Sequence, residues 1–169
     1  SLGVTEQDSL VVFVSQPFAK FRGQDASEPD FMGYDEHSVV ALLVAALERA
    51  VVESGRAISL LVRPHPRENP EGFSALHSDL VRIRVSTEGD AREVVCAADL
   101  VVGMNTVLLV EACHLGCLVV SLQPNMRGLD PLPTNRQGIS RAVYTEAEVF
   151  PTIRDHLFDP ATRAQAVAR

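Results

Sequence analysis

Short apolar runs alternate along this chain with longer segments of helical periodicity, and this alternation limits the folds that the chain can adopt. The apolar runs fall at residues 10–17, 57–64, 81–86, 99–104 and 117–124, with a weaker one at 139–144. Such alternation is typical of βαβ units, in which crossovers make consecutive strands parallel. The runs around Val12, Leu61, Val101 and Val119 are almost continuously apolar, which indicates strands covered by helices on both faces. We therefore predict the α/β class, as a three-layer Rossmann-like doubly wound parallel sheet of about six strands in the order 3-2-1-4-5-6.

Helical patterns fill the gaps between these runs. The segment from Tyr34 to Gly55 combines an acidic first turn with helical apolar spacing and a terminal glycine, which predicts a helix. Asp90 suits the cap of another helix over 89–98. Further helices are predicted at 70–79, at 105–116 and beyond Thr145, and loops at 18–34 and 125–138.

The length of the chain fits one domain. With 169 residues there is room for one core, so residues 1–169 are predicted to form a single Rossmann-like domain. The first residue is Ser rather than Met, and both a processed chain and a fragment of a longer two-domain protein stay open. No apolar run is long enough to span a bilayer and no secretory signal is recognised, so we expect a cytoplasmic protein without a transmembrane segment.

Charge and cysteine content exclude some partners. A net charge of −7 does not suit a nucleic-acid partner, which requires an extended basic face. Cys96, Cys113 and Cys117 form no paired framework and are interpreted as packing residues in a reducing compartment. A zinc site that recruited His114 would lack a second ligand pair, so no metal is expected.

The residues that directly follow the strands of a doubly wound sheet converge on one crevice. Here they are Gln16, the segment 63–67, Ser86 with Thr87, the segment 103–106 and the segment 123–127. Several of them are polar or cationic although the chain as a whole is acidic. We therefore predict a ligand site at this edge, with Gln16 among the substrate-binding residues.

One segment of this edge, "RPHPRENP" at residues 63–70, holds a histidine between two prolines. Pro64 and Pro66 restrict the backbone around His65, so its side chain loses little conformational freedom on binding. Arg63 and Arg67 can supply forked donors to a diphosphate or a carboxylate. The alternative is that the prolines simply end a strand and that His65 is a surface residue.

A second segment, "GMNTVLLVEACHLG" at residues 103–116, resembles a phosphate cradle in outline. Gly103 permits a tight turn or a close backbone approach. Asn105 and Thr106 are natural helix caps, and the backbone N–H groups at the start of this helix are expected to point into the crevice. Glu111, on the same helix, can accept hydrogen bonds from a ribose diol. An ordinary capped helix, with Glu111 at the surface or paired with an arginine, is the alternative.

Two nucleotide-binding fingerprints are missing from the sequence. The first strand is followed by "SQPFAKFRG" at 15–23 rather than by a G-x-G-x-x-G motif, and there is no G-x-x-x-x-G-K-[ST] motif. NAD enzymes and P-loop NTPases are therefore disfavoured.

The His65-Pro66 pair after a strand, followed by "NTVLLVEACHLG" at 105–116, resembles the carboxyl-terminal, donor-binding half of GT-B glycosyltransferases. The pattern is most similar to bacterial sialyltransferases and polysialyltransferases, CDP-glycerol glycerophosphotransferases and related capsule enzymes. Those families place an HP motif after one strand and a Ser-Ser or Ser-Thr pair at a later helix start, and both contact the nucleotide phosphate. Asn105-Thr106 stands where the serine pair would be, so the second motif matches in position only.

This resemblance implies that the domain binds a nucleotide sugar, CMP-, CDP- or UDP-linked, as a substrate, without a cofactor or metal. It implies that His65 and Thr106 stabilise the leaving phosphate, that Arg63 and Arg67 assist, and that Glu111 holds the ribose. An amino-terminal domain of these families supplies the glycan acceptor site and usually the catalytic base, so this domain alone is expected to lack both. The implied role is in surface polysaccharide or capsule synthesis, in the cytoplasm and peripheral to the inner membrane.

Other functions stay open. A non-catalytic module, or one subunit of a split enzyme, would bind a nucleotide or phosphosugar without chemistry. An enzyme similar to UDP-N-acetylglucosamine 2-epimerases, which share the architecture, is disfavoured because "SQPFAKFRG" lacks their histidine-arginine motif after the first strand. A protein-interaction domain would leave Arg63 and His65 splayed to solvent.

Overall fold

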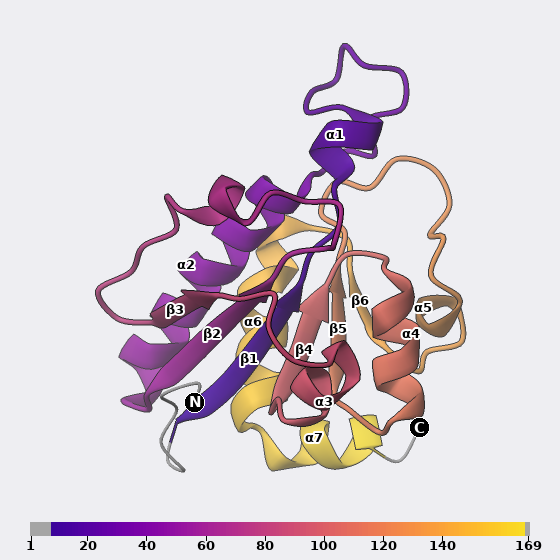
Figure 1. Ribbon diagram of the computed structural model, residues 1–169. Coiled ribbons are helices and arrows are strands. Elements are labelled where there is room, and N and C mark those ends of the chain that lie inside the picture. Colours follow the sequence, from indigo (N-terminus) through magenta and orange to yellow (C-terminus); the bar gives the residue numbers. More distant parts are fainter. Residues whose placement is uncertain (1–7, 168–169) are drawn as a thin grey trace.

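The computed structural model describes residues 8–167. Its centre is a six-stranded parallel sheet in the order β3-β2-β1-β4-β5-β6 (Figure 1). The strands are β1 (Ser9–Val14), β2 (Ile58–Arg63), β3 (Arg82–Val85), β4 (Leu100–Gly103), β5 (Val119–Leu122) and β6 (Arg141–Val143). The predicted fold class, strand number and strand order are confirmed.

Helices cover both faces of the sheet, with α2 and α6 on one face and α3 and α4 on the other (Figure 1). The helices are α1 (Phe18–Arg22), α2 (Glu36–Ser54), α3 (Ala91–Cys96), α4 (Val107–His114), α5 (Pro133–Arg136), α6 (Glu146–Phe158) and α7 (Pro160–Val167), with one 3-10 turn, η1 (Pro70–Phe73). None of the helices within residues 8–167 is both long and apolar enough to cross a membrane.

The two hydrophobic cores explain why the central strands are apolar at nearly every position. Along β1, Val11 and Phe13 belong to the core beneath α2 and α6. Val12 and Val14 belong to the core beneath α3 and α4. The edge strand β3 departs from this rule, because its two arginines are exposed. The central strands are therefore buried on both faces, as the apolar runs predict.

Local signals fix the helix ends. Asp35 forms a capping box with Ser38 at the start of α2, and Gly55 ends that helix in the left-handed conformation with φ 67°. Asp90 accepts hydrogen bonds from the first N–H groups of α3, as predicted.

Three short elements differ from the expectation. The predicted loop 18–34 contains α1, and the predicted loop 125–138 contains α5, whose first turn holds a proline. The predicted helix over 70–79 is limited to η1, which includes Gly72. Glycine disfavours helix because it is conformationally free, and a single 3-10 turn is what remains.

Two buried strand serines allow a matched test of stability. Ser59 Oγ on β2 has no hydrogen-bond partner among the described residues. Ser121 Oγ on β5 donates to Met104 O and accepts from Gln123 Nε2 at 2.9 Å. Because an unpaired buried polar group costs about 1–3 kcal/mol, Ser59→Ala should leave the free energy of unfolding unchanged or raise it by up to about 1 kcal/mol. Ser121→Ala should lower it by about 1–3 kcal/mol in urea denaturation. Equal losses in both variants would contradict the unpaired state of Ser59.

Candidate functional site

Three loops meet at the carboxyl edge of the sheet. Strand β1 lies between β2 and β4, so the loop after β1 is flanked by the turn after β2 and by the start of α4. The segment carrying α1 projects beyond the carboxyl ends of the strands (Figure 1). This is the switch point of the sheet, where ligands of doubly wound folds bind.

His65 lies in a tight turn directly after β2. Its carbonyl oxygen accepts from the Glu68 N–H at 2.8 Å, with Pro66 in the turn position that its fixed φ favours. Its ring atom Nδ1 accepts from the Arg67 backbone N–H at 3.1 Å. The neutral ring therefore carries its proton on Nε2, which has no hydrogen-bond partner among the described residues. Burial, and then the Arg67 charge, lower the pKa of His65, so at neutral pH the ring offers one N–H donor.

Glu68 links this turn to β1, and no sequence pattern singled it out. Its Oε1 accepts from Ser15 Oγ at 2.7 Å and its Oε2 accepts from the His65 N–H. Burial raises the pKa of Glu68, and the carboxylate of Glu36 adds to that effect. Glu36, His37 and Glu68 help to line a hollow of about 380 Å³ behind the turn. The predicted cationic edge is therefore offset by two acids.

The two arginines that flank His65 have different surroundings. Arg63 donates from Nη1 to Glu88 O at 2.6 Å and from Nη2 to Gly89 O at 2.7 Å, so its guanidinium holds the loop after β3. Arg67 is exposed, and its guanidinium has no hydrogen-bond or ion-pair partner among the described residues. Of the predicted pair of forked donors, only Arg67 is available without breaking other contacts.

Gly103 and Thr106 lie at the junction of β4 and α4. A Cβ at Gly103 would lie 2.9 Å from Val14 O, so the close backbone approach expected at this glycine is to β1. Thr106 Oγ1 accepts from the Leu108 N–H at 3.3 Å and caps α4, as predicted. The first turn of α4 contains no acidic residue, so its N–H groups and dipole favour an anion.

Asn105 begins a chain of buried and partly buried polar contacts that runs across the edge. Its Nδ2 donates to Tyr34 Oη at 3.4 Å, and that hydroxyl donates to Gln123 Oε1 at 3.0 Å. Gln123 Nε2 in turn donates to Asp130 Oδ1 at 3.0 Å, and Tyr144 Oη donates to Asp130 Oδ2 at 2.7 Å. Burial alone would raise the pKa of Asp130, but these and two further hydrogen bonds lower it. The network orients Asn105 and holds the loop after β5.

Glu111 pairs with Arg92 of α3. Arg92 Nε lies 3.2 Å from Oε2 and Nη2 lies 3.0 Å from Oε1, and these hydrogen bonds lower the pKa of Glu111. Exposed pairs of this kind contribute little to stability in water, so a ligand hydroxyl can compete for the carboxylate. The ribose role of Glu111 stays a prediction, and the arginine pairing that was its alternative is present.

Gln16, the second residue after β1, has a buried Oε1 that accepts no hydrogen bond from the described residues. Buried polar atoms are normally paired, so this oxygen is an exception, and it can accept from a ligand donor only after the Gln16 amide turns outward. The structure thus places Gln16, His65, Arg67, Asn105 and Thr106 in the segments that follow β1, β2 and β4, at one edge of the sheet.

The described residues contain no metal site. Within residues 8–167 no three His, Cys, Asp or Glu side chains cluster in a way that could hold a metal ion. The three cysteines are free thiols. Burial, and then the neighbouring Cys96, raise the pKa of Cys117 to about 11, which keeps it protonated at neutral pH.

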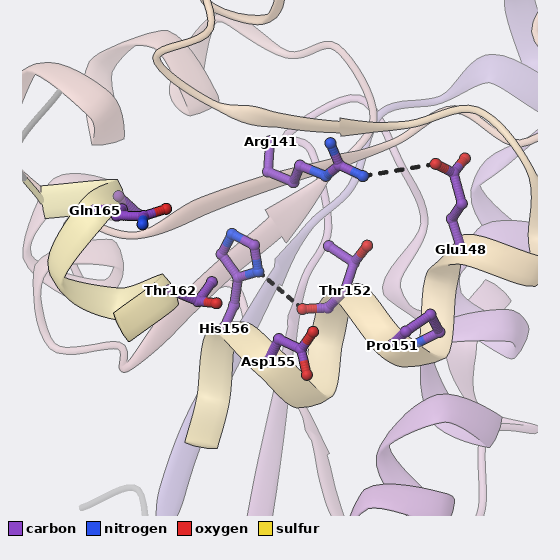
Figure 2. A pocket seen from close by; sticks show the side chains of 9 residues that line it. Arg141, Glu148, Pro151, Thr152, Asp155, His156, Thr162 and Gln165 are labelled. Atoms are coloured by element: carbon purple, nitrogen blue, oxygen red, sulfur yellow. Dashed lines mark hydrogen bonds and ion pairs between the residues drawn. The ribbon is translucent and has the colours of Figure 1, made fainter. Parts of the chain in front are cut away.

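A separate hollow of about 350 Å³ lies beside the edge strand β6, bordered by α6 and α7 (Figure 2). There Arg141 pairs with Glu148 at 3.5 Å, and His156 Nδ1 lies 2.8 Å from Thr152 O. None of the predicted site residues lines it. Its mixed charges give no preference for an anion, and the carboxyl edge stays the candidate site.

Comparisons with known proteins find likeness in fold only. No protein-family model and no curated protein match the chain. Among solved structures, it is similar to S. aureus MnaA with UDP, with a TM-score of 0.64 and 12% identity over 95% of this chain and 39% of that one. A Neisseria meningitidis UDP-GlcNAc 2-epimerase bound to UDP-GlcNAc gives a TM-score of 0.59 and 10% identity over 97% of this chain and 40% of that one. The wall teichoic acid polymerase TagF gives a TM-score of 0.59 and 12% identity over 98% of this chain and 35% of that one.

Identities this low show the fold alone. The structural neighbours comprise UDP-GlcNAc 2-epimerases and GT-B glycosyltransferases, so the chain has the fold of a GT-B half-domain. It spans between 35% and 40% of the length of the three structures described. The closer resemblance to sialyltransferases stays a prediction.

The pKa of Glu68 gives a pH test of its burial. Because the native carboxyl has a raised pKa, the native state binds a proton at a pH at which the unfolded chain has released it. The free energy of unfolding of the wild type, relative to that of Glu68→Gln, should therefore rise as the pH falls from about 7 to about 4. At neutral pH the wild type should bear the full cost of burying the ionised carboxylate. Urea denaturation of both proteins across this range measures the difference, and a flat or opposite difference curve would contradict the assignment.

Proposed function

We propose that this chain is the nucleotide-sugar donor-binding half of a GT-B type glycosyltransferase of surface polysaccharide or capsule synthesis. The observation that carries the proposal is the pairing, on a GT-B half-domain fold, of a rigid His65 Nε2–H with the capped start of α4 at the same sheet edge. Solved neighbours of this fold carry UDP or UDP-GlcNAc. On this proposal, the sugar donor that the chain binds is linked to CMP, CDP or UDP.

His65 and Thr106 would stabilise the negative charge that develops on the leaving nucleotide phosphate. His65 supplies one imidazole N–H, and the residues from Thr106 onward supply the backbone N–H groups of an uncompensated helix start. Arg67 adds a cationic donor, and Glu111 and Gln16 would contact the ribose and base. No metal and no cofactor take part on this proposal, and another domain would supply the glycan acceptor site and the catalytic base.

An epimerase-like function is the second candidate, because epimerases of this fold are among the neighbours. In this chain the loop after β1 is "SQPFAKFRG", without the histidine-arginine motif that such enzymes carry there. A non-catalytic nucleotide-binding subunit needs the same donor site and differs only in lacking turnover. Nucleotide binding is therefore the first property to measure.

The first test is a thermal-shift and calorimetric screen of the whole chain against CMP, CDP, UMP, UDP and inorganic phosphate. A ligand that binds only the native state raises its apparent stability. We expect one nucleotide to bind selectively and His65→Ala to weaken it by about tenfold or more, since a charge-assisted hydrogen bond is lost.

The matched control for this screen is His77→Ala. His77 is 82% exposed and lies next to Asp79, away from the carboxyl edge. Binding that survives in His65→Ala, or that is lost equally in both variants, would count against the proposed site.

Substitution of Arg67 and substitution of Arg63 should have different effects in the same assay. Arg67→Ala should weaken nucleotide binding about threefold to tenfold and reduce its salt dependence, because an unpaired exposed cation is removed. Arg63→Ala should instead lower the melting temperature, because the carbonyls of Glu88 and Gly89 lose their donor. The opposite pattern would place Arg63 at the ligand and Arg67 outside it.

A further inference from the structure

The turn that carries His65 is unusually poor in backbone donors. Pro64 and Pro66 have no N–H, so His65 supplies the only backbone N–H between Arg63 and Arg67. That N–H donates to Glu68 Oε2. The backbone of the turn therefore depends on this one carboxylate for its anchor at His65.

We propose that Glu68 is a positioning residue that fixes His65 over the carboxyl edge by bridging the turn to the end of β1. Its second oxygen accepts from Ser15 Oγ at 2.7 Å, and Ser15 directly follows β1. The Ser15 N–H also donates to Arg63 O at 3.0 Å, so the bridge continues the pairing of β1 with β2. The ligand part of this inference rests on the proposed function, whereas the positioning is a property of the free protein.

All three N–H groups of the turn act on His65. The His65 N–H is held by the Glu68 carboxylate, the Glu68 N–H donates to His65 O, and the Arg67 N–H donates to His65 Nδ1. The last of these sets the tautomer, since an Nδ1 that accepts leaves the proton on Nε2. Loss of the bridge between Glu68 and Ser15 would loosen the turn. The hydrogen bond from the Arg67 N–H to His65 Nδ1, which selects this tautomer, would then be weakened.

Glu68 acts through His65 rather than on a ligand. Each of its oxygens already accepts one hydrogen bond, Oε1 from Ser15 and Oε2 from His65. Its charge has the same sign as a phosphate, so direct contact between the two is unfavourable. The donors Ser15 and His65 compensate part of the cost of burying this carboxylate beside Glu36.

The test compares Glu68→Ala, Glu68→Gln and Ser15→Ala by ¹⁵N NMR of the imidazole nitrogens, with His65→Ala to assign the His65 signals among the five histidines. Wild type should show the Nε2–H tautomer of His65. Glu68→Ala should shift the ring to a mixture of tautomers, Ser15→Ala should do so to a smaller extent, and Glu68→Gln should restore the wild-type state. The restoration is expected because an amide oxygen can accept the His65 N–H while the amide donates to Ser15 Oγ.

The matched control is Glu71→Ala, an exposed acid three residues further on whose side chain accepts from Asn69. It should leave the His65 signals unchanged. UDP and inorganic phosphate are titrated into each variant, and Glu68→Ala should weaken their binding about tenfold while Glu71→Ala does not.

A folded Glu68→Ala protein that keeps the wild-type His65 tautomer would overturn the proposal. If Glu68→Ala does not fold, Ser15→Ala decides, and an unchanged His65 spectrum in that variant would overturn it equally. If wild type binds neither UDP nor phosphate, the proposed function fails, but the NMR comparison still decides whether Glu68 positions His65.

Discussion

Parallel pairing of β1 with both β2 and β4 is the constraint on which the rest of this structure depends. Because β2 lies on one side of β1 and β4 on the other, the loops after β2 and β4 diverge at the carboxyl edge, which makes this the switch point of the sheet. The pairing is close enough to require Gly103, whose missing side chain makes room for Val14. The switch point therefore follows from the strand packing, and the residues after each strand decide which groups this edge offers to a ligand.

Sequence reasoning predicted the sheet and its order because those depend on patterns that repeat along the chain. Apolar runs and caps such as Asp90 and Thr106 are local signals, and both match the structure. The general right-handedness of crossovers then gives the strand order that is observed. The topology places Gln16, His65 and Asn105 in the loops after β1, β2 and β4, and their common role in binding stays a prediction. Short elements such as α1 were missed, because a single turn carries no periodicity.

Side-chain pairing could not be predicted in the same way. The hydrogen bond between Ser15 and Glu68 joins residues that are 53 positions apart in the sequence, and the one between Tyr34 and Gln123 joins residues that are 89 positions apart. No local spacing encodes either contact. The two arginines beside His65 look equivalent in sequence, yet only one of them reaches the carbonyls after β3. A cationic segment in a sequence is therefore weak support for an anion site on its own, because some of its arginines, such as Arg63, bind loop carbonyls instead.

The buried and half-buried carboxylates of this edge are all engaged within the domain. Glu68 accepts from Ser15 and His65, Glu36 accepts from the Ala19 N–H, and Asp130 is held by four donors. The four hydrogen bonds to Asp130 stabilise its charged form and lower its pKa, which makes it a weaker base for an acceptor hydroxyl. Burial raises the pKa of Glu68, but both of its oxygens hold the turn and the end of β1. On the proposed function, this edge holds an anion and stabilises a leaving group, and a base for an acceptor comes from another part of the protein. That division of roles is the one expected of a single half of a two-domain enzyme.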